Sequence, residues 1–241
     1  MAVDSPPLVV IEGLSKRFGP TWALRKVDLT LTAGAFLTVF GPNGAGKTTL
    51  IRILATLSRP SSGKIYLAGV PLQRAGTQLR RSIGLVTHQT LLYPDLSAEE
   101  NLRFYGRLYD IAELDSHVDR ALERVNLQGR RYSLVHEFSR GMQQRLSIAR
   151  AILHNPAVLL LDEPYTGLDP EAAEVLEEIL TGLSRQGRTI IMATHNLERG
   201  LALCDEVAIL ARGRVAYRAP RKEIDGGDFG AIYRHYVAQA A

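Results

Sequence analysis

The sequence lacks most of the features that mark secreted, membrane-spanning or nucleic-acid-binding chains. Its 241 residues contain one cysteine, Cys204, which excludes an internal disulfide and fits a reducing compartment. The longest apolar runs, such as 157–161, are far shorter than the roughly 18 residues of a bilayer-spanning helix. The N-terminus has no basic segment followed by an apolar one, so no secretory signal is expected. A membrane role therefore requires another chain as an anchor.

The sequence also has no long block of charges of one sign. The net charge is +4, but basic and acidic residues alternate without a run of about five or six like charges, so no nucleic-acid partner is expected. A composition of 46% hydrophobic and 22% charged residues is typical of a folded chain with one large core, or a core with a subdomain. Disorder is excluded as the main state.

One stretch has a definite chemistry, because it matches the pattern G-x-x-x-x-G-K-[ST]. It consists of Gly41, Pro42, Asn43, Gly44, Ala45, Gly46, Lys47 and Thr48, with Thr49 directly behind it. The apolar run 35–40 precedes it, and apolar residues at helical spacing follow it, namely Leu50, Ile51, Ile53, Leu54 and Leu57. The sequence therefore predicts a strand, a glycine loop and a helix in that order.

Such a loop is suited to an anion, since its N–H groups point inward and the following helix adds the positive end of its dipole. We expect Lys47 to reach the β- and γ-phosphates of a nucleotide and the Thr48 hydroxyl to ligate Mg²⁺. The alternative is a glycine-rich turn with a chance lysine, which the flanking strand and helix disfavour.

The chain around this loop is β-rich first, then helical, then mixed. Short strands are expected at 8–11, 27–31, 64–69 and 83–87, and these give the first third the character of a β-rich lobe. Phe18, between the first two strands, is suited either to the core or to stacking on an adenine.

In the middle third of the chain, the sequence predicts helices. One starts with the capping box of Ser97 and Glu100, and another starts after Ser139. We interpret residues of about 92–155 as a helical insertion into a single α/β domain, whose core covers about 8–91 and 156–217. A short tail, 218–241, contains a small helix through Tyr233 and Tyr236 and no specific chemistry.

Two later strands end in polar residues. The apolar strand 157–161 leads to Asp162 and Glu163, and the apolar strand 189–194 leads to His195. Ligands of parallel sheets bind at the carboxyl ends of the strands, so Asp162 is expected to hold Mg²⁺ and Glu163 to accept a proton from water. His195 is expected at the same edge. The alternatives are acids that begin a solvated loop and a structural histidine.

The segment Phe138-Ser139-Arg140-Gly141-Met142-Gln143-Gln144-Arg145, shortly before Asp162, resembles the signature loop of ATP-binding cassette (ABC) ATPases. The likeness runs from about Leu8 to Tyr217. It includes the phosphate loop, Gln89 as the glutamine loop, Gly167-Leu168-Asp169 as the D-loop and Thr194-His195 as the switch histidine. The resemblance implies an α/β P-loop NTPase core of ABC type with a β-rich N-terminal lobe and a helical subdomain.

The resemblance also implies an ATP hydrolase that pairs head to tail with a second cassette, either identical or related. Each ATP would lie between the phosphate loop of one subunit and Ser139 and Gly141 of the other. The implied roles of the remaining residues are adenine stacking for Phe18, a general base for Glu163, γ-phosphate alignment for His195, Mg²⁺ coordination for Gln89 and Asp162 with Thr48, and nucleotide contact for Asp169.

The family places such a subunit at the cytoplasmic face of the membrane, where transmembrane permease subunits dock on the helical insertion. The apolar residues 91–94 are suited to that contact, or to ordinary packing beneath the insertion. The chain departs from the family pattern at Arg140, where glycine is usual, at Met142, where glutamine is usual, and at Phe18, where tyrosine is more usual. Arg140 is suited to phosphate or partner contacts, or to solvent.

Three stretches, 88–93, 98–105 and 138–145, together are similar to the haem-exporter ATP-binding subunit of bacterial cytochrome c maturation. This similarity implies haem export or delivery, although multidrug and lipid exporters share much of it. Soluble ABC ATPases of translation or DNA repair are a second class. Translation types carry two cassettes in one chain, and repair types have a long coiled coil before the signature loop; neither feature is seen here.

Overall fold

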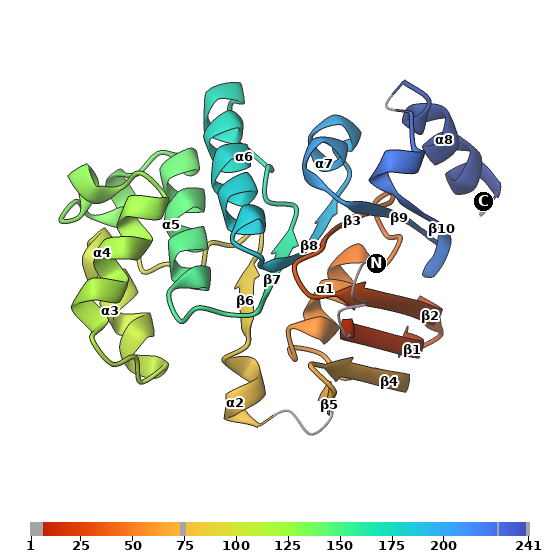
Figure 1. Ribbon diagram of the computed structural model, residues 1–241, viewed down its shortest axis with the longest axis horizontal. Helices are drawn as coiled ribbons and strands as arrows, with labels where there is room; N and C mark the ends of the chain where they lie inside the picture. Colours follow the sequence, from red (N-terminus) through yellow and green to blue (C-terminus); the bar gives the residue numbers. More distant parts are fainter. Residues whose placement is uncertain (1–6, 73–75, 226, 240–241) are drawn as a thin grey trace, which may run out of the picture.

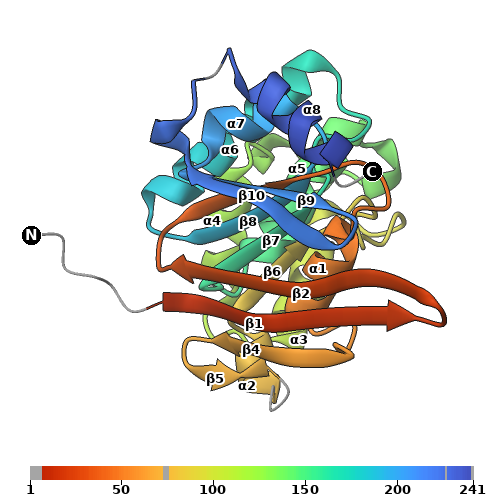
Figure 2. The same cartoon turned by 90° about the vertical axis from the view of Figure 1, so that its right-hand side faces the viewer.

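Two sheets on either side of helix α1 (Lys47–Leu54) form the body of the protein (Figures 1 and 2). The structure is a computed structural model that describes residues 7–72, 76–225 and 227–239. The smaller sheet is antiparallel, with four strands in the order β2-β1-β4-β5. Its strands are β1 (Pro7–Phe18), β2 (Thr21–Thr32), β4 (Ser62–Leu67) and β5 (Val70–Pro71).

The larger sheet has six strands in the order β10-β9-β3-β8-β7-β6. Its strands are β3 (Phe36–Phe40), β6 (Ile83–Val86), β7 (Val158–Asp162), β8 (Thr189–Thr194), β9 (Glu206–Ala211) and β10 (Arg214–Pro220). All neighbours pair in parallel except β9 and β10, which form an antiparallel hairpin. The strand expected at 83–87 was assigned to the β-rich lobe of the first third, but it is β6 and belongs to the larger sheet.

Three helices from the middle third gather at one end of the molecule (Figure 1). They are α3 (Ala98–Leu108), α4 (Leu114–Arg124) and α5 (Arg140–Ile152). Helices α6 (Pro170–Arg185), α7 (Leu197–Leu203) and α8 (Phe229–Gln239) lie over the face of the larger sheet that is opposite α1. The remaining helical segments are α2 (Thr77–Arg80) and the 3₁₀ turns Gln128–Arg130, Val135–Glu137 and Arg221–Glu223. None of the helices among the described residues is long and apolar enough to cross a bilayer.

The central strands are buried on both faces, which explains their unbroken apolar sequence. In β3, Phe36 and Phe40 join the core beneath α6 to α8, while Leu37 and Val39 join the core that contains α1. Strand β7 divides in the same way, with its apolar residues alternating between the two cores. This alternation holds the carboxyl ends of the strands at one fixed edge.

Several local predictions are confirmed, and one helix is shorter than its pattern indicates. The capping box is present, because Ser97 Oγ accepts from the Glu100 N–H at 3.2 Å and Glu100 Oε2 accepts from the Ser97 N–H at 2.8 Å. Leu57 was expected on the face of the helix after the phosphate loop, but α1 ends at Leu54 and Leu57 is 59% exposed. The chain leaves the helix through Thr56, whose φ is +62°.

Candidate nucleotide site

Four neighbouring parallel strands bring the predicted site residues to one edge of the larger sheet. In the spatial order β3, β8, β7 and β6, these strands lead into the glycine loop, His195, the Asp162–Glu163 pair and the segment with Gln89. The carboxyl edge of a parallel sheet is where such folds bind ligands. The arrangement of strands therefore collects residues that are far apart in the sequence.

The glycine loop packs closely against neighbouring backbone, and at two of its positions only glycine leaves room for this packing. Gly46 has a φ of +109°, and a Cβ at this position would lie 2.4 Å from the Ala23 carbonyl oxygen. A Cβ on Gly41 would lie 2.3 Å from the Leu210 carbonyl oxygen. The turn closes through the Ala45 N–H, which donates to the Pro42 carbonyl at 3.1 Å, while Asn43 and Gly44 are exposed at its tip.

Lys47 is buried beside the loop that it belongs to, with a side chain only 6% exposed. Its ammonium group donates to the Gly41 carbonyl at 2.7 Å and to the Pro42 carbonyl at 3.3 Å. The same nitrogen lies 3.4 Å from Glu163 Oε1. The ammonium group is therefore held between the loop and the carboxyl end of β7, where it can meet an anionic ligand.

Thr48 and Asp162 form the second contact between the loop and β7. The Thr48 hydroxyl donates to Asp162 Oδ1 at 3.1 Å. Burial raises the pKa of Asp162, and Glu163 adds to this rise, whereas the Thr48 hydrogen bond, His88 and Lys47 oppose it. The described residues contain no group of three or more His, Cys, Asp or Glu side chains that could cage a metal ion. A hydroxyl and one carboxylate nevertheless fit Mg²⁺, which usually keeps several waters and binds through substrate phosphates.

An Asp162→Asn variant, without nucleotide or metal, is expected to unfold at a higher temperature than the natural chain at pH 7. The native state binds the Asp162 proton more tightly than the unfolded state, so the ionised carboxylate destabilises the fold above the raised pKa. We expect a rise on the order of 2–4 °C, the shift for about 1 kcal/mol in a chain of this size.

Calorimetry at several pH values tests this expectation. The difference between the two proteins should shrink as the pH falls toward 3.8, the ordinary pKa of an aspartate. Substituting the exposed Asp95 with asparagine is the control and should leave the transition unchanged. A variant that is less stable than the natural chain at pH 7 would contradict the assigned cost of burying Asp162.

Glu163 lies at the centre of a hydrogen-bonded cluster. Its Oε2 accepts from Thr194 Oγ1 at 3.2 Å and from the His195 N–H at 3.3 Å, and it lies 2.9 Å from His195 Nδ1. The backbone has a left-handed φ of +52°, which is rare outside glycine and is fixed here by a 2.8 Å bond from the Glu163 N–H to the Ala193 carbonyl. The side chain is 20% exposed, so this carboxylate can reach a water molecule and pass a proton.

Gln89 lies at the expected edge but does not join this cluster through its side chain. Its N–H donates to Thr87 Oγ1 at 3.2 Å, and its carbonyl accepts from the same hydroxyl at 2.7 Å. No hydrogen bond of its side chain is found among the described residues. His88, which the sequence did not single out as a site residue, lowers the pKa of Asp162 through its charge.

The residues of the signature loop lie apart from the phosphate loop of the same chain. Ser139 caps α5 by accepting from the Met142 N–H at 3.2 Å. Gly141 lets α5 approach α6, since a Cβ there would lie 2.6 Å from the Ala172 Cβ. Asp169 caps α6, with Oδ1 accepting from the Ala172 N–H at 2.8 Å. Within the described part of the chain, no hydrogen bond or ion pair joins these residues to Lys47 or Glu163.

Arg140 does not simply project into solvent. Its guanidinium donates to the His88 carbonyl at 2.7 Å, although the two residues are 52 positions apart. Its Cγ and Nε also lie 3.8 Å from the place of a Cβ on Gly167. One side chain thus joins the signature loop, the segment with Gln89 and the D-loop within the same chain.

Phe18 and Thr49 complete the predicted set. Phe18 is 55% exposed at the turn between β1 and β2, so it is not a core residue. The ammonium of Lys16 lies 4.7 Å from the centre of its ring. Thr49 is half-buried in the first turn of α1. The exposed ring of Phe18 offers an aromatic surface that can stack on a flat ligand.

The C-terminal tail is closer to the site than its sequence indicated. The small helix is confirmed as α8, and Phe229 at its start is 1% exposed, with its ring centre 4.9 Å from that of Phe40. Phe40 is the last residue before the glycine loop. Burial raises the pKa of Tyr233, and the charge of Glu163 adds to the rise, so α8 reaches the electrostatic field of the site.

Comparison with known proteins assigns the family. The family model described as "ABC transporter" matches residues 24–166. Nod factor export ATP-binding protein I of Cupriavidus metallidurans is 36% identical over 232 residues, which cover 94% of this chain and 77% of that protein. The ABC transporter ATP-binding protein NatA of Bacillus subtilis is 37% identical over 199 residues, or 81% of each chain. Daunorubicin resistance ATP-binding protein DrrA3 of Streptomyces coeruleorubidus is 36% identical over 225 residues, covering 91% and 71%.

Solved structures agree with these relatives. The cbiO1 subunit from Clostridium perfringens, part of the ABC transporter complex cbiONQ, is 29% identical, with a TM-score of 0.83 over 95% of this chain and 92% of that one. The dimeric ATP-binding cassette MJ0796, bound to ADP and Pi, is 26% identical, with a TM-score of 0.80 over 88% and 98% of the two chains. The fold therefore confirms the expected cassette architecture, and the chain belongs to the ABC transporter family as an ATP-binding subunit.

Proposed function

We propose that this chain hydrolyses ATP at the edge of its larger sheet and drives an exporter in the membrane. The observation that carries the proposal is the cluster around Glu163, whose Oε1 lies 3.4 Å from the Lys47 ammonium and whose Oε2 lies 2.9 Å from His195 Nδ1. A phosphate-binding lysine beside a candidate base is what phosphoryl transfer to water requires.

In this proposal each residue of the site has a separate role in binding ATP or in its hydrolysis. Lys47 and the N–H groups of the glycine loop bind the phosphates, and Phe18 stacks on the adenine. Glu163 accepts the proton of the attacking water, and His195, held by Glu163, donates to the γ-phosphate. Thr48, Asp162 and Gln89 would hold Mg²⁺, whose charge would offset the charge that develops on the phosphate oxygens.

We propose that the site is completed by a second cassette. Ser139 and Gly141 lie at the N-terminus of α5, which favours anions, yet no hydrogen bond or ion pair found among the described residues joins them to Lys47. A head-to-tail pair with twofold symmetry would bring the α5 terminus of one copy, with its Asp169, to the phosphates of the other. The MJ0796 cassette, a solved relative that is dimeric, supports pairing of this kind.

The proposed contact with a permease subunit is a patch made of Leu91, Tyr93 and Phe104, which we call the aromatic patch. These side chains are 46%, 46% and 37% exposed. The backbone beneath the patch is fixed by Asn101, which is fully buried and accepts from the Tyr93 N–H at 2.8 Å while donating to the Tyr93 carbonyl at 3.0 Å. Exposed aromatic side chains on a rigid backbone are typical anchors of an interface. The subunit would thus be peripheral, at the cytoplasmic face of the membrane.

The cargo is proposed at the level of export. The names of two of the relatives include Nod factor export and daunorubicin resistance. These names support a role in moving a small molecule out of the cell. Haem export in cytochrome c biogenesis stays a prediction that depends on the three short stretches of similarity. None of these relatives carries a haem-export name, so another exporter fits equally well.

Co-purification from membranes in mild detergent tests the proposal. Full-length chain with bound ATP is expected to recover a transmembrane protein, and Tyr93→Asp is expected to lower this recovery at least tenfold, because a charge in the centre of the aromatic patch must be desolvated on binding. Tyr132→Asp is the matched control, since Tyr132 is 79% exposed elsewhere on the helical part. Recovery of ribosomes or DNA in place of a membrane protein would contradict the proposal.

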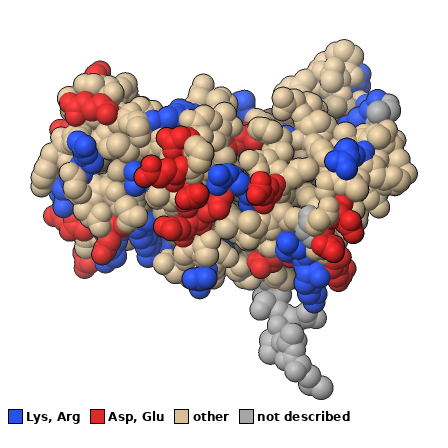
Figure 3. Space-filling model, turned by 90° about the horizontal axis from the view of Figure 1, so that it is seen from above, with Lys and Arg blue, Asp and Glu red and all other residues tan. Residues whose placement is uncertain are grey.

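The face of the molecule seen from above gives no support to a role on nucleic acid. Acidic and basic side chains are interspersed over the face seen from above, and neither sign covers it (Figure 3). A nucleic-acid interface is ordinarily a basic stripe or patch. We therefore favour the transport role over that of a soluble ABC ATPase.

A further inference from the structure

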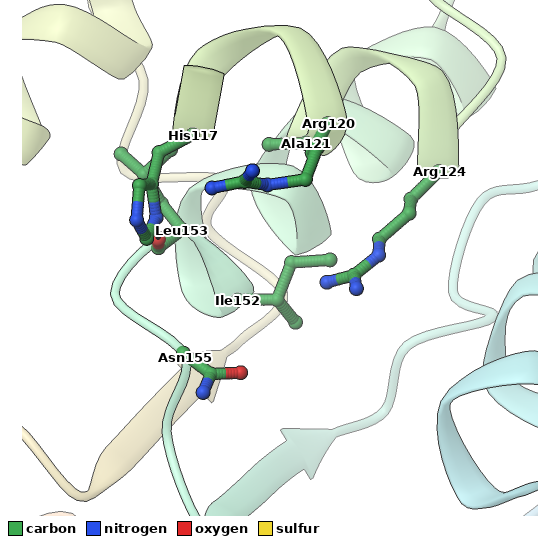
Figure 4. A pocket seen from close by; sticks show the side chains of 7 residues that line it. All are labelled: His117, Arg120, Ala121, Arg124, Ile152, Leu153 and Asn155. Atoms are coloured by element: carbon green, nitrogen blue, oxygen red, sulfur yellow. Dashed lines mark hydrogen bonds between the residues drawn. The ribbon is translucent and has the colours of Figure 1, made fainter. Parts of the chain in front are cut away.

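A hollow of about 210 Å³ lies between α4 and the end of α5, on a part of the protein that the proposed ATPase reaction does not use. It is lined by His117, Arg120, Ala121, Arg124, Ile152, Leu153 and Asn155. The long side chains of Arg120 and Arg124 extend from α4 over Ile152, and Asn155 lies across from them (Figure 4). Asn155 precedes the first residues of β7, so the hollow lies at the amino end of that strand, whereas Asp162 lies at its carboxyl end.

Positive charge gathers at this hollow without a carboxylate partner. Arg120 and Arg124 are one helical turn apart, and the lining contains no acidic residue. Arg188, which is hydrogen-bonded to Asn155, is 8% exposed, and burial together with the charge of Arg124 lowers its pKa. None of the ion pairs found among the described residues includes these three arginines. Glu178 lines an adjoining hollow together with Arg124, and no ion pair joins the two among the described residues.

Two further polar side chains, those of Asn155 and His117, line the hollow. Arg188 donates to the Pro156 carbonyl at 2.7 Å and to Asn155 Oδ1 at 2.5 Å, so the oxygen of the Asn155 amide is occupied and its NH₂ group remains for a ligand. His117 Nδ1 lies 2.9 Å from the Leu153 carbonyl, which can only accept, so this nitrogen carries the hydrogen. His117 Nε2 is left to face a ligand.

We propose that this hollow binds a phosphate group, either free or as the headgroup of an anionic lipid. Two guanidinium forks and an amide NH₂ donate to the oxygens of a phosphate, and the apolar floor of Ala121 and Ile152 accepts a short carbon chain. A bound anion removes the mutual repulsion of three arginines that the described residues do not neutralise. The site is separate from the nucleotide site, and it would join α4 of the helical part to the segment that enters β7.

The first test measures binding of inorganic phosphate by the full-length chain carrying Lys47→Ala, so that the glycine loop contributes little. Phosphate is expected to raise the midpoint of thermal unfolding, and to shift the NMR signals of the Asn155 side-chain NH₂. Adding Arg120→Gln and Arg124→Gln should weaken phosphate binding at least tenfold. The matched control is Arg107→Gln with Arg130→Gln, which removes the same charge from two exposed arginines of the helical part that have no ion pair among the described residues.

The second test distinguishes the two sources of the phosphate group. Vesicles of phosphatidylglycerol and phosphatidylcholine are compared with vesicles of phosphatidylcholine alone. Binding to the anionic vesicles that the Arg120 and Arg124 substitutions abolish, and the control pair does not, assigns the hollow to a lipid headgroup. Phosphate binding without such vesicle binding assigns it to a free phosphate compound. Equal responses of the two variant pairs to both phosphate and vesicles would overturn the proposal.

Discussion

A Glu163→Gln variant is expected to bind ATP with nearly unchanged affinity and to hydrolyse it about 10²–10⁴ times more slowly, the usual contribution of a general base. The glutamine Oε1 can still accept from Thr194 Oγ1 and the His195 N–H, which lie 3.2 Å and 3.3 Å from the carboxylate oxygen. The cluster should therefore keep its shape while losing the group that takes the proton. Release of phosphate, measured under conditions of ATP excess, checks the rate.

The same variant is expected to accumulate as an ATP-bound pair of cassettes, because in the proposed pairing ATP favours closure and its hydrolysis ends it. Analytical ultracentrifugation with and without ATP measures this association. Glu171→Gln is the control, since Glu171 is an exposed acid in the first turn of α6 without a partner among the described residues. A Glu163→Gln protein that keeps more than a tenth of the natural rate would remove Glu163 from the role of base.

Replacing Lys47 with alanine is expected to weaken ATP binding by about 30-fold or more. Truncation of a buried, hydrogen-bonded charge partner costs about 2–5 kcal/mol, and each 1.4 kcal/mol is a factor of ten in affinity. Lys47 is 6% exposed and lies between the Gly41 carbonyl and Glu163, so no other cation can take its place without rearrangement of the loop. Equilibrium dialysis with labelled ATP measures the affinity.

Lys64→Ala is the matched control for this substitution, because Lys64 is exposed on β4 and forms no ion pair among the described residues. It should bind ATP like the natural chain. Circular dichroism and thermal unfolding show whether both variants fold. If folded Lys47→Ala protein binds ATP as tightly as the control, the loop does not bind the phosphates in the proposed way.

The order of elements was predictable because the relevant signals are local. The apolar runs before Gly41, Asp162 and His195 each became a strand of the larger sheet. The edges of the small sheet were harder to predict, since alternation in β1 is interrupted where the pairing register shifts between Ile11 and Leu14. Gly13, with a φ of +56°, lies in this irregular part, and the strand continues beyond it to Phe18.

The sequence predicted which residues of the site lie near one another, but not the individual contacts between them. The pattern of strands implies that Lys47 and Glu163 share an edge, but their 3.4 Å ion pair depends on the positive φ of Glu163, which no residue pattern signals. The packing of α8 beside the site was missed for a similar reason. Phe229 contacts Phe40 across nearly the whole length of the chain, and an apolar residue in a tail does not indicate which surface it will cover.

The side chain of Arg140 connects three loops, namely the signature loop, the 88–89 segment and the D-loop. A glycine at this position, which has no side chain, leaves the segment around Gln89 free to shift without the N-terminus of α5. Here a rotation of α5 must either carry the 88–89 segment with it or break a charge-assisted bond of 2.7 Å. This bond therefore connects the N-terminus of α5 to the 88–89 segment at the edge of the larger sheet, so a rotation of α5 is expected to act on that segment.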